Sequence, residues 1–583
     1  MRNFFKIFFA SLLAIFITLI LLLVTVVILI SAASSDDAPV VKDKTVLYID
    51  LSKPVREQGG EMEFNFPNLN TDPIPGIRDY ILAVEQAASD SSVKAIYLLG
   101  GGNAMGFAAS QEFGKALDVF RESGKPIFAS GSVMPQRAYE ITHRASHIFL
   151  QPGGVFEWTG YNIELAFFKN ALDKLAIEPE IFYAGQFKSA TEPYRVTKMS
   201  DANRLQYQVF LDGIYGQFLK SVASHRALDS SQLVQLANQL AISSPDQALQ
   251  AGLIDGVLYE DEVRDSLRVL IGVKKGKDIP FMDIVQYREA TRQAGSGDRI
   301  ALVYADGIIV DGAGQSGEVA ADAFRALLSK IRSDDKVKAV VLRINSPGGS
   351  AIASEIIWRE LSLIQKEKPL VVSMGEYAAS GGYYIATMAD SIFAMPNTLT
   401  GSIGVFSVYF NAKQLLNEKL GITFDGVSTA AYADFGTVTR PMSDFEKQVA
   451  QRGVDTIYNL FKLRVAAGRK LTPVAVDSIA QGRVWTGTDA LRIGLIDRVG
   501  TLEEAIASAA SMANIESYTL RAYPEVKNFL ERLMDNSDPN TTEMKMVEKY
   551  MGTNATNWFK EIRQISKMAN QTQMRMPFIP QLP

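Results

Sequence analysis

A serine in the second half of the chain stands where a nucleophile could work. Ser380 lies in the segment 377–383, Tyr-Ala-Ala-Ser-Gly-Gly-Tyr, among small residues and directly before a helical pattern. The free N–H groups and the positive end of a helix would lie beside its hydroxyl, which suits attack on a carbonyl carbon. The same position also suits a serine that only caps the helix. This segment alone leaves both interpretations open.

A pair of glycines upstream favours the chemical interpretation. Gly348 and Gly349 end the segment 345–349, Asn-Ser-Pro-Gly-Gly, which follows an apolar run. Paired glycines often mark only a turn, but they also let the backbone approach a ligand closely. One N–H from this turn and one from Gly381 could form an oxyanion hole, in which each donor contributes about 3 kcal/mol to catalysis. Together with Ser380, the turn favours an acyl-transfer site.

A serine nucleophile needs a base, and the composition restricts the choice. The chain has three histidines, His143, His147 and His225, and all of them precede Ser380. A serine–histidine pair would have to form between distant halves of the chain, so we expect these histidines to be structural. The absence of cysteine excludes thiol nucleophiles, disulfides and cysteine-ligated metals. The net charge of −5 gives no indication of nucleic-acid binding.

Comparison of the chain with itself reveals an internal repeat. The matching segments are 92–99 with 336–343, 124–127 with 367–370, 146–149 with 390–393, 199–201 with 442–444, and 252–255 with 494–497. The order is collinear and the offset stays between 242 and 244 residues. We therefore predict two copies of one unit, over residues 45–265 and 299–524. A linker over residues 266–298 and a C-terminal extension over residues 525–583, partly helical in pattern, complete the chain.

Each unit has the pattern of an α/β fold. In the second copy, residues 337–344 and 370–373 form β-branched runs that predict buried strands, and helical periodicity follows each run. Repeated strand–loop–helix segments predict stacked ββα repeats with mainly parallel pairing. The Gly-Gly turn and these repeats are features of crotonase-like and Clp-protease-like folds. The predicted architecture is two tandem α/β copies of that type.

An apolar segment near the N-terminus predicts a membrane anchor. Residues 7–30 carry no charge, and a helix of this length would reach about 36 Å, enough to span a bilayer. Arg2 and Lys6 precede the segment, so residues 1–6 are expected in the cytoplasm and the rest of the chain outside it. A cleaved signal peptide is the competing interpretation, because residues 31–34 are small. Its apolar region would usually span only about 7–15 residues, which favours an uncleaved single-pass anchor.

Four motifs together resemble the signal peptide peptidase A (protease IV) family of serine peptidases, in its long, two-copy, membrane-anchored form. They are Ser-Pro-Gly-Gly at 346–349, Ala-Ser-Gly-Gly-Tyr at 379–383, Thr-Gly-Ser-Ile-Gly at 400–404, and Gly-Gln-Phe-Lys-Ser-Ala at 185–190 with Glu-Pro at 192–193. The resemblance extends from the anchor to about residue 524. It implies that Ser380 of the second copy is the nucleophile and Lys188 of the first copy is the general base. It also implies that Ser402, 22 residues after Ser380, orients the lysine amine.

The repeat makes a single site per chain the expected arrangement. Position 380 corresponds to Gln136 in the first copy, and Lys188 corresponds to about Ala431 in the second, so each copy keeps one half of the pair. An ordinary lysine has a pKa near 10.4, and burial can lower it by about 3–5 units. We therefore expect Lys188 in a largely apolar pocket, without a salt bridge to Glu192, the nearest acidic residue in sequence.

The resemblance also implies substrates, partners and location. The expected substrates are hydrophobic remnants of signal peptides and other hydrophobic peptides, cleaved without a cofactor or metal ion. A homo-oligomer, expected to be a tetramer, would stand on the outer side of the inner membrane. The alternatives are a Clp-like general protease, a crotonase-like acyl-CoA enzyme and an inactive membrane scaffold. A crotonase-like enzyme would need acidic catalytic residues, and a decayed scaffold would be expected to lose Ser380, Lys188 or Ser402.

Overall fold

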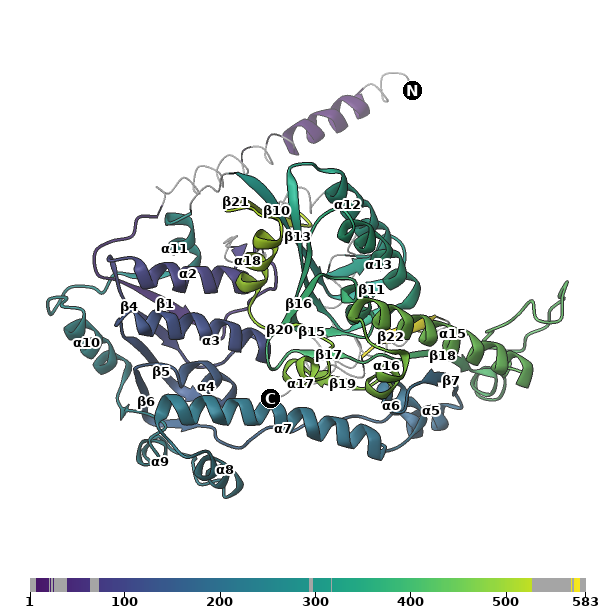
Figure 1. Cartoon of the computed structure of the whole chain (residues 1–583), viewed down its shortest axis with the longest axis horizontal. Coiled ribbons are helices and arrows are strands. Elements are labelled where there is room, and N and C mark those ends of the chain that lie inside the picture. Colours follow the sequence, from purple (N-terminus) through teal and green to yellow (C-terminus); the bar gives the residue numbers. More distant parts are fainter. Residues whose placement is uncertain are drawn as a thin grey trace.

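The computed structural model describes residues 7–19, 21, 25, 39–62, 73–292, 297–315, 317–526, 568 and 571–576. Two α/β units lie side by side, the first purple to teal and the second teal to yellow-green (Figure 1). Each contains a mainly parallel sheet with helices packed on it. The strands are near-continuous apolar runs because sheets of this kind are buried on both faces.

The first unit is built on a parallel six-stranded sheet with the order β8-β6-β5-β4-β1-β9. Its strands are β1 (Thr45–Asp50), β4 (Val93–Leu99), β5 (Ile127–Met134), β6 (His147–Phe156), β8 (Gly256–Val257) and β9 (Phe281–Asp283). Its helices include α2 (Ile77–Ser89), α3 (Phe107–Glu122), α4 (Gln136–Thr142), α8 (Ser230–Asn238), α9 (Pro245–Gln250), α10 (Glu260–Leu270) and α11 (Ile284–Ala290). Strand β2 (Glu61–Met62) pairs antiparallel with β3 (Pro73–Ile74).

The second unit repeats this plan. Its sheet has the order β19-β17-β15-β13-β10-β21, and β16 and β20 extend it from β15. The strands are β10 (Asp298–Asp306), β13 (Val337–Ser346), β15 (Leu370–Ala379), β16 (Ser391–Ala394), β17 (Leu399–Gly401), β19 (Val484–Thr486), β20 (Arg498–Val499) and β21 (Tyr518–Tyr523). Its helices are α12 (Ala321–Ser333), α13 (Ala351–Gln365), α14 (Gly381–Ala386), α15 (Asp444–Arg469), α16 (Pro473–Ile479), α17 (Gly487–Arg492) and α18 (Leu502–Met512).

The structure confirms the predicted repeat in detail. Helices α2 and α12 both have 13 residues, α10 and α18 both have 11, and the long helices α7 (Asp201–Arg226) and α15 both have 26. Side-chain contacts repeat as well. The ion pair of Arg226 with Asp255 at 2.7 Å has its counterpart in Arg469 with Asp497 at 2.6 Å. Equal lengths and matching tertiary contacts identify the two units as copies of one architecture.

The predicted linker over residues 266–298 mostly belongs to the first unit, so the boundaries drawn from the sequence need correction. Helix α10 continues to Leu270, β9 pairs in parallel with β1, and α11 contacts α2. The segment contains Gly and Lys because its turns are exposed. The short apolar stretches between those turns are enough to add an edge strand and a helix.

A third sheet joins the two copies and the C-terminal extension. Its order is β12-β11-β14-β22-β18-β7, over β12 (Glu318–Ala320), β11 (Ile308–Val310), β14 (Gly348–Ser350), β22 (Thr572–Arg575), β18 (Val405–Asn411) and β7 (Glu178–Ala184). Strand β7 comes from the first copy and pairs antiparallel with β18 of the second. The C-terminal extension, predicted as a partly helical tail, contributes β22; most of its other residues lie outside the described part of the chain.

Helix α7 runs beneath both units (Figure 1). Its first half packs against the second unit, where Tyr207 and Phe210 share a buried cluster with Ala379. Its second half packs in the core of the first unit through Phe218 and Val222. The helix therefore fixes the position of one copy relative to the other.

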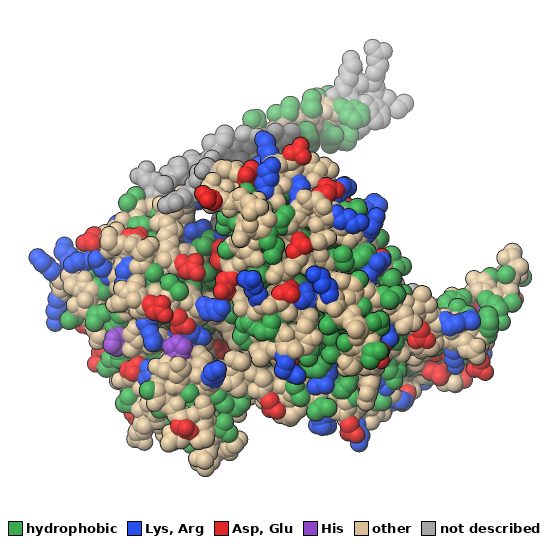
Figure 2. Space-filling view, in the orientation of Figure 1, with side chains coloured by type: hydrophobic (Ala, Val, Ile, Leu, Met, Phe, Trp, Pro, Cys, Tyr) green, Lys and Arg blue, Asp and Glu red, His purple; other side chains and the backbone are tan. Residues whose placement is uncertain are grey.

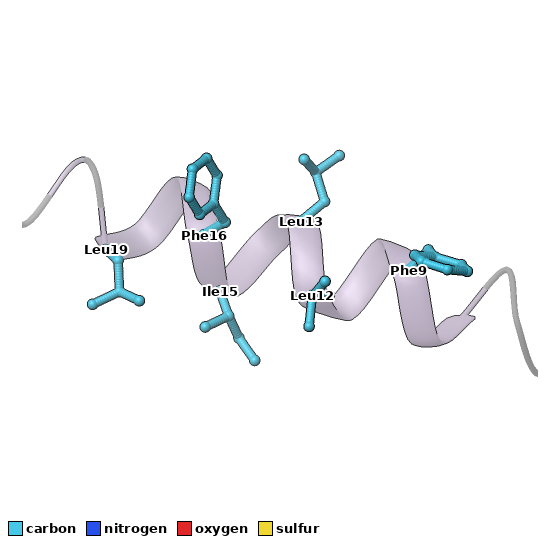
Figure 3. Close-up of a pocket in the computed structure, with 6 residues that line it drawn as sticks. All are labelled: Phe9, Leu12, Leu13, Ile15, Phe16 and Leu19. Carbon is cyan, nitrogen blue, oxygen red and sulfur yellow. The ribbon is translucent and has the colours of Figure 1, made fainter. Parts of the chain in front are cut away.

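The N-terminal helix is apolar on more than one side. Residues 7–19 are helical, and Figure 3 shows Leu13 and Phe16 on one side and Leu12, Ile15 and Leu19 on another. These side chains are exposed, and they form part of the green surface at the top of Figure 2. Among the described residues, no helix is both long and apolar enough to cross a membrane. The predicted anchor over residues 7–30 also includes residues 20, 22–24 and 26–30, which lie outside the description.

Candidate active site

Ser380 lies at the sharp junction between β15 and α14. Its backbone angles, φ 56° and ψ −113°, are unusual for a residue with a side chain, and such strain persists only where the surroundings hold it. Its N–H donates to the Gly401 carbonyl at 2.8 Å, and its carbonyl accepts from Tyr384 at 2.8 Å. The side chain makes no cap hydrogen bond to the helix, so the helix-cap interpretation does not describe it. Its hydroxyl lies instead 3.4 Å from the Gly404 carbonyl oxygen.

Lys188 reaches this serine from the first copy. It follows β7, and the pairing of β7 with β18 carries the loop after β7 into the second unit. Its Nζ lies 2.8 Å from Ser380 Oγ, although 192 positions separate the two residues in the chain. Both side chains are buried, with Lys188 only 1% exposed. The structure thus brings together the two residues that the resemblance paired.

Ser402 completes the surroundings of the lysine amine. Nζ lies 3.1 Å from Ser402 Oγ and 3.1 Å from the Ser402 carbonyl oxygen. A neutral amine has two N–H donors and one lone pair. The two donors can bind the two oxygens of Ser402, and the lone pair then faces the hydroxyl of Ser380. Every hydrogen-bonding group of a neutral lysine is satisfied by this arrangement.

Burial lowers the pKa of Lys188 well below its ordinary value, because the charged amine loses its hydration in the interior. The one acidic residue close in sequence, Glu192, is engaged elsewhere. Its carboxylate accepts from the Ser200 hydroxyl at 2.5 Å and from the Asn203 amide at 2.8 Å, at the start of α7. Within the described part of the chain, no carboxylate forms an ion pair with Lys188. The environment favours the neutral form that can accept a proton.

The glycine turn lies beside the nucleophile, and the hydrogen bonds of its two N–H groups differ. The Gly348 N–H donates to Ser346 Oγ at 3.2 Å, which leaves the Gly349 N–H as the donor from this turn. A Cβ built on Gly381 would lie 3.2 Å from the Gly349 nitrogen, so the two glycines face each other closely. Gly348 has φ +96°, and a Cβ on it would lie 2.7 Å from the Gly381 nitrogen. Gly348 therefore keeps the space in front of the donors open.

The structure adds Gly482, which the sequence reasoning missed. A Cβ on Gly482 would lie 2.7 Å from both the nitrogen and the Cβ of Lys188, and its φ is +74°. The Phe187 N–H donates to the Gln481 carbonyl at 2.7 Å, which fixes the lysine loop on this turn. A lone glycine 102 positions after Ser380 carries no signal of its own, because its importance lies only in a contact between the two copies.

The remaining predicted positions lie apart from these residues. Gln136, at the place of Ser380 in the first copy, is buried and accepts N–H bonds from Thr159 and Gly160. Ala431, the counterpart of Lys188, is exposed. His143 contacts the Tyr139 carbonyl and Ser221 within the first copy, which agrees with a structural role.

Comparisons with known proteins give a consistent picture. The model of peptidase family S49 matches residues 119–274 and 362–516, once in each unit, and a Clp protease model matches residues 292–400. "Protease 4" of Salmonella typhi is 36% identical over 472 residues, which cover 79% of this chain and 75% of that protein. "Serine protease SPPA, chloroplastic" of Arabidopsis thaliana is 34% identical over 74% of this chain and 64% of that protein. "Putative signal peptide peptidase SppA" of Enterococcus faecium is 35% identical over 40% of this chain and 70% of that protein.

Proposed function

The chain belongs to peptidase family S49 and is a serine-type endopeptidase, and we propose that it cleaves peptide bonds with Ser380 as nucleophile and Lys188 as general base. The observation that carries this proposal is the 2.8 Å separation of Nζ and Oγ in a buried site. Ser402 orients the amine through the two oxygens that accept its N–H bonds. Family membership weighs against the acyl-CoA enzyme and the inactive scaffold.

In the proposed reaction, neutral Lys188 takes the proton of Ser380 as Oγ attacks the scissile carbonyl carbon. The developing oxyanion accepts hydrogen bonds from the N–H groups of Gly349 and Gly381. Lys188 then passes its proton to the leaving amine. It activates water in the same way to hydrolyse the ester on Ser380. Burial assists each step, because a lysine with an ordinary pKa would stay protonated near neutral pH.

The proposed substrates are remnant signal peptides and other hydrophobic peptides. The Enterococcus relative carries the name "Putative signal peptide peptidase SppA", and we take from it the substrate class proposed here. The apolar N-terminal helix supports a position at the membrane where such peptides reside. We propose a single-pass protein of the inner membrane whose catalytic part faces away from the cytoplasm. A homo-oligomer, with a tetramer as the expected form, is part of the same proposal.

A general protease of the Clp type is the nearest alternative, and substrate choice distinguishes the two. The purified protein in detergent should cleave a hydrophobic signal-peptide fragment much faster than a polar peptide of equal length. Equal rates on both peptides would favour the general protease. Fractionation of cells should place the protein with the inner membrane, and recovery in the soluble fraction would contradict the proposed location.

The roles of the two residues are tested by substitution. Lys188→Ala and Ser380→Ala should both fold but lose turnover of the peptide, and only Ser380→Ala should also lose the site of covalent labelling by an acylating reagent. Lys368→Ala is a matched control, because burial also lowers the pKa of Lys368 while its Nζ binds main-chain carbonyls away from Ser380. Wild-type turnover in the Lys188→Ala protein would eliminate the assignment of the base.

A further inference from the structure

Gln206 of helix α7 joins the lysine loop of the first copy to a strand of the second. Its side chain is buried, and its amide nitrogen donates to Ser189 Oγ at 2.9 Å and to the Phe187 carbonyl at 3.3 Å. Its amide oxygen accepts from the Val484 N–H at 3.2 Å, at the start of β19. Phe187 and Ser189 are the residues directly before and after Lys188. One side chain therefore holds the backbone on both sides of the candidate base.

Glu192 fixes which way this amide points. A carboxylate only accepts hydrogen bonds, so the nitrogen of the Asn203 amide faces Glu192, at 2.8 Å. The Asn203 oxygen is then turned toward Gln206 and accepts from its nitrogen at 3.1 Å. The oxygen of Gln206 is left to face the Val484 N–H. Glu192, Asn203 and Gln206 are all buried, so each polar group selects the orientation of the next.

The copy that has no lysine at this place does not repeat these amides. When Ser200 is aligned with Ser443, the counterparts of Glu192, Asn203 and Gln206 are Phe435, Glu446 and Val449. Both serines cap their long helices, Ser200 in α7 and Ser443 in α15, and both helices have the same length. The two amides are therefore not needed to build the helix. They accompany the lysine.

Residues 482–484 of the second copy support both the lysine loop and Ser402. The Ser402 N–H donates to the Arg483 carbonyl at 2.7 Å, and the next N–H along the strand binds the Gln206 oxygen. The long side chain of Lys188 is flexible, so its amine stays beside Ser402 only if its backbone is fixed against the same segment. Gln206 makes this connection across the two copies.

We propose that Gln206 is a positioning residue that holds Lys188 against Ser380. It takes no part in proton transfer and acts through the backbone on either side of the lysine. Asn203 and Glu192 act through Gln206, because they fix the orientation of its amide. This gives a role to the Glu-Pro motif at 192–193, which the catalytic steps do not use. The proposal rests on the proposed function, in which Lys188 is the base.

Gln206→Met is the first test, because methionine is similar in size and cannot make the hydrogen bonds. We expect kcat on a peptide ester to fall about 100-fold, the loss that a displacement of about 1 Å can produce, with KM close to wild type. The released amine regains part of its hydration, so the pKa of Lys188 should rise toward its ordinary value. The acidic limb of kcat/KM against pH should therefore move to higher pH.

Gln208→Met is the matched control, with the same substitution two positions along the same helix. The Gln208 side chain is exposed and donates to Asp212 of α7 at 2.8 Å. This variant should keep the wild-type kcat and pH profile. Unchanged kcat in Gln206→Met would refute the positioning role. A fall in kcat with the acidic limb in its wild-type place would refute it too, because a loss of folded protein lowers the rate equally at every pH.

Ser189→Ala keeps the proposal testable if Gln206→Met does not fold. It removes one acceptor of the Gln206 nitrogen and leaves the amide in place. The loss of one neutral hydrogen bond corresponds to a fall in kcat of about 2- to 13-fold, again with the acidic limb at higher pH. In the double variant the two losses should not multiply, because both changes remove the same contact. Wild-type kcat in Ser189→Ala, or losses that multiply in full, would contradict the proposal.

Lys188→Ala, assayed in parallel, separates this proposal from the proposed function. Loss of turnover in Lys188→Ala together with the wild-type rate and profile in Gln206→Met overturns the positioning role alone. Wild-type turnover in Lys188→Ala overturns the assignment of the base, and the positioning role with it. The expected result is a complete loss in Lys188→Ala and a partial loss in Gln206→Met.

Discussion

Replacement of Ser402 by alanine should weaken the enzyme without abolishing it. The variant removes one acceptor, the Oγ atom 3.1 Å from Lys188 Nζ, and keeps the main-chain oxygen at the same distance. A neutral hydrogen bond contributes about 0.5–1.5 kcal/mol net, which corresponds to a fall in kcat of about 2- to 13-fold. The loss stays modest because the remaining acceptor still orients the amine.

The pH profile gives a second, independent expectation for this variant. Hydrogen bonds to a charged group contribute about 1.5–3 kcal/mol, more than those to a neutral group. Removal of Ser402 Oγ therefore destabilises protonated Lys188 more than neutral Lys188, and its pKa falls further below the ordinary value. The acidic limb of kcat/KM against pH should move to lower pH in Ser402→Ala.

The assay is steady-state hydrolysis of a peptide ester from acidic to alkaline pH, for wild type, Ser402→Ala and the control Ser362→Ala. Ser362 is buried like Ser402. Its hydroxyl donates to the Arg359 carbonyl at 2.6 Å, and the hydroxyl of Ser402 lies 3.4 Å from the Gly482 carbonyl oxygen. The control should keep the wild-type profile. A limb that moves to higher pH, or a fall in kcat of three orders of magnitude, would refute the role given to Ser402.

Three further predictions concern stability and the contact between the copies. The folded-state pKa of Lys188 lies below its unfolded value, so the unfolded chain binds more protons between the two values and stability rises with pH there. Lys188→Met should therefore raise the midpoint of urea unfolding, most at low pH. An unchanged midpoint at every pH would contradict a buried amine. Gly482→Ala should cost at least about 1–2 kcal/mol and much of the activity, since its φ is +74° and its Cβ would meet the Lys188 backbone. Gly494→Ala, at φ +80° with no neighbour closer than 3.7 Å, should cost only the backbone strain and keep activity. Arg343→Leu should cost about 3–5 kcal/mol in urea unfolding, because it leaves the buried carboxylates of Glu57 and Glu112, both in the other copy, without their ion-pair partner. A loss below about 1 kcal/mol would show that these pairs do not hold the copies together.

Much of the architecture could be predicted because its signals are local. Buried strands, the glycine turn and the helix after Ser380 each arise from short runs of neighbouring residues. The repeat could be found because both copies keep those runs at a nearly constant offset. The boundaries were less predictable. An edge strand as short as β9 carries too few apolar residues to stand out from a polar segment.

The pairing of Ser380 with Lys188 came from the resemblance and could not come from local pattern. Ser380 has a local signal, the turn of small residues between a strand and a helix. Lys188 has none, because a lysine after a strand is ordinarily a surface residue. Its burial depends on β7 leaving the first copy to pair with β18 of the second.

The sequence by itself determined that the chain repeats one α/β unit, that a serine follows a buried strand in the second copy, and that no histidine follows it. Only the tertiary structure decided which backbone surrounds the amine, which glycine N–H groups lie beside Ser380, and that β22 pairs between β14 and β18. The physical reason is that strand pairing uses main-chain groups present in nearly every residue. A strand's side-chain pattern shows which face is buried, while its partner is selected by the packing of the whole fold.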